Sequence, residues 1–185
     1  ISDPEGKLTA ELLLDAVEMI TAHDAHVAGY ILEKDKSIVV IVNKWDAVEK
    51  DSYSMQDMTT KLRQELKFMD YVPFLFISAK TGQRVDQVMP TALAVQEERL
   101  ARLSTGQLNR ILQHAQDAHT PTGRQGRSIR LYYGTQVRSD PPTFLVYCND
   151  PGLAHFTYLR FLENRIRAEY PFTGTPIRIV LKPRR

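Results

Sequence analysis

Hydrophobic residues in the first half of the chain form short unbroken runs separated by helical patterns. Two runs, Ile38–Val42 and Pro73–Ile77, are typical of strands buried on both faces of a parallel sheet. Leu12–Asp15 resembles the end of an earlier strand. The spacing Thr21-x-x-Asp24 resembles a capping box and predicts a helix through about Glu33. Met55, Met58, Leu62 and Leu66 recur every three or four positions and predict a second helix, and a third is predicted at about residues 86–103. This β-α-β-α-β-α order predicts an α/β fold with right-handed crossovers.

The second half has a different rhythm, which predicts a small helix-on-sheet domain of order α-β-β-α-β. In its first strand Ile129, Leu131 and Tyr133 alternate with Arg130 and Tyr132, so we expect the first three to face the core. The other elements are predicted at residues 105–118 (helix), 143–148 (strand), 155–170 (helix) and 177–181 (strand).

The net charge also differs between the two halves of the chain. Up to Leu103 there are 12 Lys and Arg against 17 Asp and Glu, a net charge of −5. From Ser104 there are 12 against 5, a net charge of +7. We therefore predict two domains, residues 1–103 and 104–185, and the basic one is the candidate for binding RNA.

Cysteine usage and hydropathy bear on the cellular compartment. A single cysteine excludes an internal disulfide framework and suits a reducing compartment. No stretch approaches eighteen apolar residues and no signal sequence leads the chain, so we expect a soluble cytoplasmic protein without a membrane span. The chain begins at Ile1 rather than Met, which suggests that it is part of something longer.

The stretch Asn43-Lys44-Trp45-Asp46 carries the most specific chemistry of the first half. It ends a predicted parallel strand, at the sheet edge where open α/β folds bind ligands. The Asp46 carboxylate can accept hydrogen bonds from the N1–H and 2-amino group of guanine. Adenine lacks both donors, and such a mismatch discriminates by roughly 10⁴ or more. The Asn43 amide can contact the base or tie neighbouring loops together, and the Lys44 stem can lie along the ring.

A second polar loop, Ser78-Ala79-Lys80, ends the next apolar run. Two unrelated polar loops after core strands would be the simpler explanation. Their order, their positions at strand ends and the helical spacer between them instead resemble the two guanine loops of G-domain GTPases. That resemblance implies that the Ala79 backbone N–H donates to guanine O6, which adenine does not have.

The chain from Leu12 onward resembles the Der (EngA) family, bacterial GTPases with two tandem G domains and a C-terminal KH-like domain. The expected fold is a partial P-loop GTPase (G domain) parallel sheet followed by a small α+β KH-like domain. Besides the two loops, the matching residues include Asp15-Ala16, Ala28-Gly29-Tyr30, Tyr132-Tyr133, Pro141-Pro142-Thr143-Phe144, Asn149-Asp150-Pro151 and Tyr158-Leu159-Arg160.

The resemblance implies the function. Der proteins bind and hydrolyse GTP, act in assembly of the large ribosomal subunit and associate with ribosomal RNA. The implied ligands are GTP or GDP with Mg²⁺, and a first G domain, missing here, is expected to pack on the KH-like domain. The implied guanine-binding residues are Asn43, Lys44, Asp46, Ser78, Ala79 and Lys80.

One family motif is missing from the sequence. No G-x-x-x-x-G-K-[ST] phosphate loop occurs, so the catalytic residues are unknown and no Mg²⁺ ligand is visible. The string D-x-x-G occurs only at residues 3–6, ahead of the first predicted strand, and we do not assign it as a switch loop. We expect the missing half of this G domain upstream of Leu12. The G-x-x-G string at residues 123–126 precedes the first predicted strand of the second domain, which is the wrong place for a KH-type RNA clamp.

Arginines are the candidate RNA contacts of the second domain, although they also serve to solvate a small domain. We expect Arg160 and Arg167 to point outward from their helix. The full candidate set is Arg124, Arg127, Arg130, Arg160, Arg167 and Arg178. The histidines do not have metal-ligand spacing, so no metal site is predicted.

Two functions remain open from the sequence. One is a GTPase that acts in large-subunit assembly, represented here without its phosphate loop. The other is a non-catalytic RNA or protein interaction module in which the half G domain is a scaffold.

Overall fold

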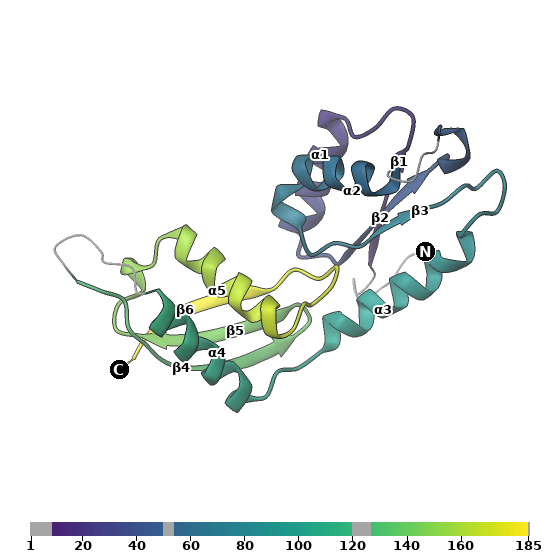
Figure 1. Cartoon of the computed structure of the whole chain (residues 1–185). Helices are drawn as coiled ribbons and strands as arrows, with labels where there is room; N and C mark the ends of the chain where they lie inside the picture. The colour runs from purple at the N-terminus through teal and green to yellow at the C-terminus, as the bar shows by residue number, and fades with distance from the viewer. Residues whose placement is uncertain (1–8, 50–53, 120–126, 185) are drawn as a thin grey trace. The chain divides into compact units, whose positions relative to one another are not determined.

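The computed structural model describes residues 9–49, 54–119 and 127–184. The chain divides into two compact units (Figure 1). The first unit comprises the residues up to Arg99 together with Thr173–Pro176. The second comprises Leu100–Phe172 and Ile177–Arg185.

Three parallel strands form the sheet of the first unit, in the order β1-β2-β3. They are β1 (Ala10–Asp15), β2 (Ile38–Asn43) and β3 (Phe74–Phe76). The central strand β2 is buried from its first residue to Val42, as its unbroken apolar run predicts. Asp15 pairs with Asn43 in the register, so β1 and β2 end at the same edge. This confirms the predicted parallel sheet.

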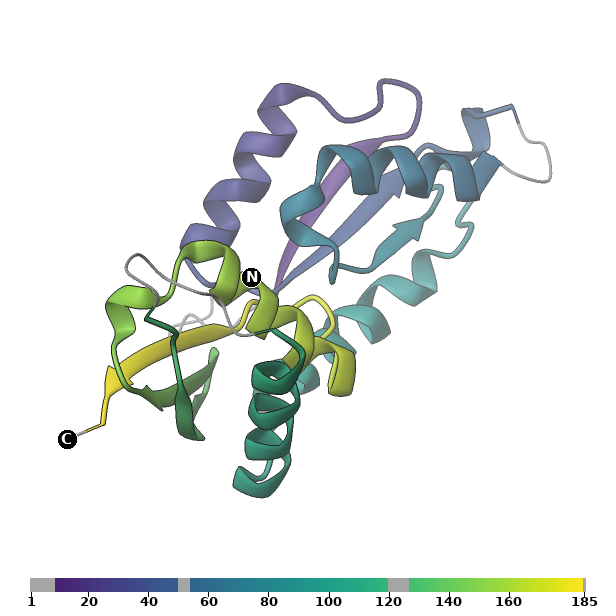
Figure 2. The same cartoon turned by 60° about the vertical axis from the view of Figure 1, so that its left-hand side comes forward.

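Helices cover both faces of this sheet (Figures 1 and 2). Buried residues of α1 (Ala22–Glu33) and α2 (Ser54–Glu65) pack with Leu12, Leu14, Val40 and Val42. On the other face, Val95 of α3 (Val88–Leu100) packs with Val39 and Ile41. Short 3₁₀ turns complete the unit at Trp45–Ala47 (η1), Lys67–Met69 (η2) and Val85–Gln87 (η3).

The start of α1 is fixed by side chains, as the Thr21-x-x-Asp24 spacing predicts. The Thr21 hydroxyl accepts the Asp24 N–H at 3.3 Å, and the Asp24 carboxylate accepts the Thr21 N–H at 2.9 Å. Two backbone donors that a helix start leaves unpaired are thereby satisfied.

Thr173–Pro176, far along the chain, belongs to the first unit and binds at the start of β2. The Gly174 carbonyl accepts the Ile38 N–H at 2.8 Å, and the Gly174 N–H donates to the Tyr71 carbonyl at 2.9 Å. The fully buried Thr175 hydroxyl lies 3.0 Å from the Ser37 hydroxyl. Neither hydrophobic pattern nor charge in the sequence indicates this placement.

The second unit has one three-stranded sheet, in the order β4-β5-β6. Its strands are β4 (Leu131–Ser139), β5 (Pro142–Cys148) and β6 (Arg178–Pro183). β4 and β5 are antiparallel, whereas β5 and β6 are parallel. The parallel pair is joined through η5 (Pro151–Leu153) and α5 (Phe156–Glu169). The α-β-β-α-β order is as predicted.

One face of this sheet packs on α5 and on α4 (Thr105–Ala118). The shared core includes Leu108, Leu112, Phe144, Val146, Tyr158, Leu162 and Ile166. The Asn109 side chain fastens α4 to β4, since its amide donates to the Gly134 carbonyl and accepts the Gly134 N–H, both at 2.9 Å. Because Gly134 has no side chain, α4 can approach the strand this closely.

The prediction for Tyr133 is wrong. Ile129 and Leu131 are buried, but Tyr133 is 45% exposed and its neighbour Tyr132 is 41% exposed. The register shifts between Leu131 and Tyr133, which pair with Cys148 and Tyr147. A β-bulge of this kind adds a residue to one strand and resets the alternation of its side chains. Two consecutive tyrosines are therefore exposed.

Candidate functional site

The loop after β2 is held in place by Trp45. This side chain is 3% exposed, and its ring centroid lies 4.8 Å from that of Phe76 in β3. Its backbone N–H donates to the Ile77 carbonyl at 3.0 Å. Lys44, just before it, has a left-handed backbone with φ 60° and ψ 31°. The buried indole thus fixes the positions of Lys44 and Asp46 on either side of it.

A direct hydrogen bond links the loop after β2 to the loop after β3. The Ala79 backbone N–H donates to Asn43 Oδ1 at 3.0 Å. Of the roles that the sequence left open for Asn43, tying neighbouring loops together is the one the structure contains. The same N–H was expected to meet guanine O6, so a bound base would have to share this donor with Asn43 or take it over.

Ser78 is the centre of a second link between the two loops. Its side chain is fully buried, and its hydroxyl donates to Asp46 Oδ1 at 2.5 Å. The Ser78 hydroxyl oxygen accepts the Thr81 N–H at 3.1 Å, while the Ser78 backbone N–H donates to the Gln83 carbonyl at 3.0 Å. Ser78 therefore orients the Asp46 carboxylate and shapes its own loop. Its hydroxyl is suited to both tasks because it donates one bond and accepts others.

Asp15, at the end of β1, is an additional residue at this edge. Its Oδ1 accepts the Val17 N–H at 2.8 Å, and its Oδ2 lies 2.5 Å from Lys44 Nζ. The hydrogen bond from Lys44, helped by the Val17 N–H, lowers the pKa of the Asp15 carboxyl. The same ion pair raises the pKa of Lys44. The sequence indicated only that Asp15 ends a strand, and its contact with Lys44 follows from the pairing of Asp15 with Asn43.

The structure joins four of the six predicted guanine-site residues by direct hydrogen bonds, Asn43 to Ala79 and Asp46 to Ser78. The fifth, Lys44, follows Asn43 in the chain and pairs with Asp15. The sixth, Lys80, is exposed beside Ala79. Gly82, in the same loop, has φ +79°, a conformation that glycine adopts without strain.

Comparisons with known proteins agree with this two-part organisation. Residues 9–98 match the elongation factor Tu GTP binding domain family, and residues 102–182 match the family described as KH-domain-like of EngA bacterial GTPase enzymes, C-terminal. GTPase Der of Caldanaerobacter subterraneus subsp. tengcongensis is 47% identical over 173 residues, 94% of this chain and 39% of that protein. GTPase Der of Herpetosiphon aurantiacus is 47% identical over 176 residues, 95% of this chain and 39% of that protein. The chain belongs to the Der (EngA) family.

The chain spans about two fifths of the length of the Der proteins it matches. Among solved structures, one of Era from Aquifex aeolicus aligns with 94% of this chain and 64% of that chain, at 14% identity and a TM-score of 0.40. That similarity is too low to carry an argument. The fold of this Der-family chain is a partial G-domain sheet followed by a KH-like α+β unit.

The described residues contain neither a metal-binding cluster of side chains nor a membrane-spanning helix. Residues 9–49, 54–119 and 127–184 contain no group of three or more His, Cys, Asp or Glu side chains placed to hold a metal ion. The part of the chain that the structure describes also has no helix long and apolar enough to cross a membrane.

The candidate arginines do not share one surface. Arg124 lies outside the described residues. Arg127, Arg130, Arg160 and Arg178 are exposed. Arg160 belongs to α5, which packs on one face of the second sheet. Arg178 follows Ile177 and precedes Ile179, both of which pack toward the core, so its side chain belongs to the other face.

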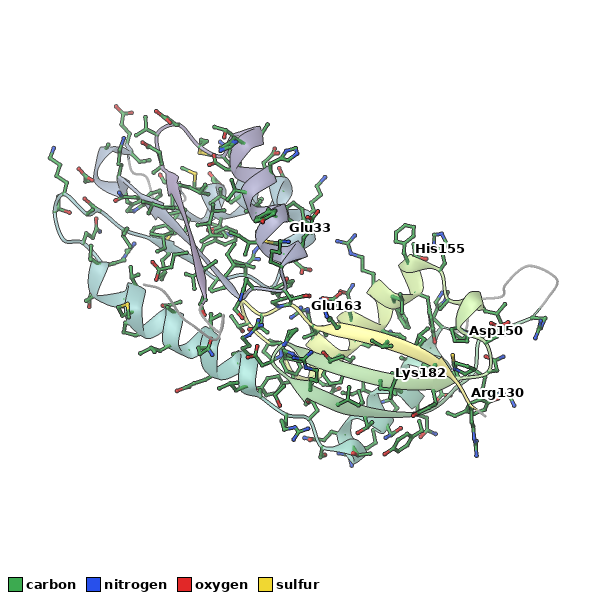
Figure 3. All side chains as sticks on the ribbon, turned by 180° about the vertical axis from the view of Figure 1, so that it is seen from behind. Glu33, Arg130, Asp150, His155, Glu163 and Lys182 are labelled. Carbon is green, nitrogen blue, oxygen red and sulfur yellow. The ribbon has the colours of Figure 1, made fainter. Side chains whose placement is uncertain are left out.

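Arg167 does not point outward as predicted. Its side chain is 10% exposed and forms an ion pair with Glu163, labelled in Figure 3, at 2.9 Å. Its guanidinium also donates to the carbonyls of Pro171 and Phe172 at 2.9 and 3.3 Å. Arg167 therefore stabilises the end of α5 and the turn after it, because its fork of donors reaches several acceptors at once.

Proposed function

We propose that this chain is the guanine-recognising half of a G domain together with its KH-like unit, from a cytoplasmic GTPase that acts in assembly of the large ribosomal subunit. The observation that carries this proposal is the double link between the two loops, Asn43 to Ala79 and Asp46 to Ser78. Two loops from different strands, fixed to one another at the carboxyl edge of a parallel sheet, form a preorganised place for a planar base.

Recognition of guanine would divide between the two loops. Asp46 would accept the N1–H and 2-amino hydrogens, and its bond from Ser78 holds it in place before the base arrives. Ala79 would donate to O6 once its N–H is shared with, or released by, Asn43. The stem of Lys44 would lie along one side of the base, with its ammonium retained by Asp15. Lys80 is exposed and would flank the base from its own loop.

Hydrolysis would depend on residues beyond this chain. The sequence has no G-x-x-x-x-G-K-[ST] motif, and the described residues offer no cluster of Mg²⁺ ligands. Mg²⁺ therefore does not fit the residues that the structure describes. The edge strand β1 supports a missing half: Leu13 is 60% exposed, on the face opposite Leu12 and Leu14.

Trp45 allows a direct test, because it is the only tryptophan and lies between Lys44 and Asp46. We expect millimolar GMP to change its fluorescence in a saturable way and AMP to leave it unchanged. The two ligands carry the same ribose and phosphate, so any difference reports the base. Asp46→Ala should weaken the GMP response by tenfold or more, which is about 1.4 kcal/mol. Equal responses to GMP and AMP, with calorimetry giving equal affinities, would contradict guanine recognition.

The ribosomal part of the proposal needs a separate test. Co-sedimentation of the chain with purified large ribosomal subunits should exceed that with small subunits, and it should weaken steeply as salt increases. Equal or absent sedimentation with both subunits would argue against this part.

A non-catalytic interaction module is the second candidate, favoured by the lack of a phosphate-loop motif in the sequence. It predicts sedimentation with ribosomal particles but no distinction between GMP and AMP. The two experiments together therefore separate the candidates.

A further inference from the structure

The second sheet has one face that α4 and α5 do not cover. Alternation along β5 sends Phe144, Val146 and Cys148 into the core and places Leu145 and Tyr147 on the other face. The same alternation along β6 places its polar and basic side chains on that second face. Figure 3 views the molecule from behind relative to Figure 1 and labels Lys182, in β6, and Arg130, before β4.

Aromatic side chains gather at one end of this open face. The register pairs Tyr133 with Tyr147, and their ring centroids are 6.5 Å apart. The bulge in β4 adds Tyr132, and the Arg184 guanidinium lies 5.1 Å from the centre of its ring. These four side chains line a hollow of about 370 Å³, here called the tyrosine pocket. A bulge that exposes two consecutive tyrosines is a departure from regular pairing, and such bulges often re-aim side chains.

The charged side chains on the strands that form the tyrosine pocket are all basic. Lys182 pairs with Tyr147 across the sheet, and Arg178 pairs with Thr143 on the same face. Strands β4, β5 and β6 contain no aspartate or glutamate at all. Of the nearby acidic residues, Glu163 and Glu169 belong to α5, and Asp140 and Asp150 lie beyond the two ends of β5. Asp117 of α4 lines a neighbouring hollow together with Tyr132 and Arg130.

We propose that the tyrosine pocket binds an unpaired base of single-stranded RNA, with Lys182 and Arg184 contacting the adjacent phosphates. This inference rests on the RNA association that is part of the proposed function. It places the RNA contact at the tyrosine pocket, not at the six candidate arginines or at a G-x-x-G loop. Stacking suits the pocket, because tyrosine rings offer flat faces to any base and a guanidinium can stack as well. A site that bound only phosphate groups would need only the basic side chains. The three clustered, partly exposed tyrosines suit a planar group in addition.

The experiment measures binding of a fluorescein-labelled oligouridine to the chain by anisotropy. We expect Tyr133→Ala and Tyr147→Ala each to weaken binding about 5- to 100-fold. Tyr133→Phe keeps the ring and should bind like the unchanged chain. Arg184→Ala should weaken binding and lower the dependence of log K on log salt by about one.

Tyr30→Ala is the matched control. Tyr30 is 60% exposed in the first unit, and the Lys34 ammonium lies 5.3 Å from its ring centre, so the substitution removes a similar cation-covered tyrosine elsewhere. It should leave oligouridine binding unchanged. Double-stranded RNA should compete poorly, since its bases are already stacked.

Several results would overturn the proposal. They are unchanged binding by both alanine variants, equal competition by double-stranded RNA, or no oligouridine binding at all. If the two alanine variants bind RNA as tightly as the unchanged chain and with the same salt dependence, the RNA contact lies on another surface. The proposed function would not be affected by that result. The tyrosine variants should keep the GMP response of Trp45, so failure of guanine recognition shows separately from failure of the pocket.

Discussion

The Asn43 side chain accepts the backbone N–H of Ala79 at 3.0 Å, across 36 positions of sequence. This bond joins the ends of two neighbouring parallel strands. It lies beside the 2.5 Å bond from Ser78 to Asp46, so each loop is fixed by the other. The proposed guanine recognition uses a carboxylate and an N–H that are both already oriented.

Changing Asp46 to Asn should change which base is preferred. An amide loses the negative charge that favours the N1–H and 2-amino donors of guanine, and it gains a donor of its own. Xanthine has a carbonyl in place of the 2-amino group, so it would accept that donor. We expect GMP binding to weaken at least about tenfold, since hydrogen bonds to charged groups are worth about 1.5–3 kcal/mol. XMP should bind better to the variant, and unchanged preference would mean that Asp46 does not contact the base.

The Asp15–Lys44 pair should be visible in an acid titration. The pKa of the Asp15 carboxyl is lowered from its usual 3.8, chiefly by Lys44. Because the folded-state pKa is the lower one, the pair's stabilisation is complete above 3.8 and is lost as the pH falls through the folded-state pKa. Carboxyl NMR of Asp15 should show a higher pKa in Lys44→Met than in the unchanged chain. A pKa that does not move would mean that the ion pair does not persist in solution.

Gly174→Ala should destabilise the first unit. Gly174 has φ +66°, and an added Cβ would lie 2.8 Å from the Ile38 carbonyl oxygen and 2.7 Å from a Val95 methyl. Backbone strain and overpacking together should cost about 2–5 kcal/mol. Hydrogen exchange at the Ile38 amide, which donates to the Gly174 carbonyl, should accelerate accordingly. Gly106→Ala in α4 is the control, since nothing lies within 4 Å of its added Cβ and exchange at Ile38 should not change.

Tyr158→Phe should stabilise the second unit. Tyr158 is 2% exposed, and within the described residues its hydroxyl has no hydrogen-bond partner. Removing an unsatisfied buried hydroxyl should raise the free energy of unfolding by about 1 kcal/mol. Burial also raises the pKa of Tyr158 to about 12. The unfolded chain therefore loses this proton first, and stability falls as the pH rises from 10 toward 12.

Denaturation at pH 8 and at pH 11 measures both effects. The variant should be more stable than the unchanged chain at either pH, with the larger difference at pH 11. Tyr133→Phe, at an exposed position, is the control and should behave like the unchanged chain. A less stable Tyr158→Phe variant would mean that the hydroxyl has a partner in solution.

The sequence predicted those parts of the fold that depend on local pattern. The unbroken run of β2 and the Thr21–Asp24 capping box determine their elements through neighbouring residues alone. The predicted boundary between residues 103 and 104 lies near the point where the units divide, but the return of Thr173–Pro176 to the first unit has no local signal. It depends on hydrogen bonds between segments more than a hundred positions apart.

The candidate site divides in the same way. The motif spacing placed both loops at one sheet edge, because parallel strands end together. It did not indicate that Asn43 would engage Ala79, since an amide has several equivalent uses. The prediction that Arg167 points outward was wrong. Helical spacing gives only the side of the helix on which a residue lies, and it carries no information on the Pro171 and Phe172 carbonyls beyond the helix end that accept hydrogen bonds from Arg167. Tyr133 was misplaced because a bulge has no reliable sequence signature.

An NMR titration of the isotopically labelled chain tests the central claim most directly. GMP should shift the backbone amides of Ala79 and of the Lys44–Ala47 turn, because the Ala79 N–H exchanges its Asn43 acceptor for guanine O6. AMP at the same concentration should leave these signals unchanged. If AMP shifts the same amides to the same extent, or if GMP shifts only residues away from both loops, the two loops do not form a guanine site.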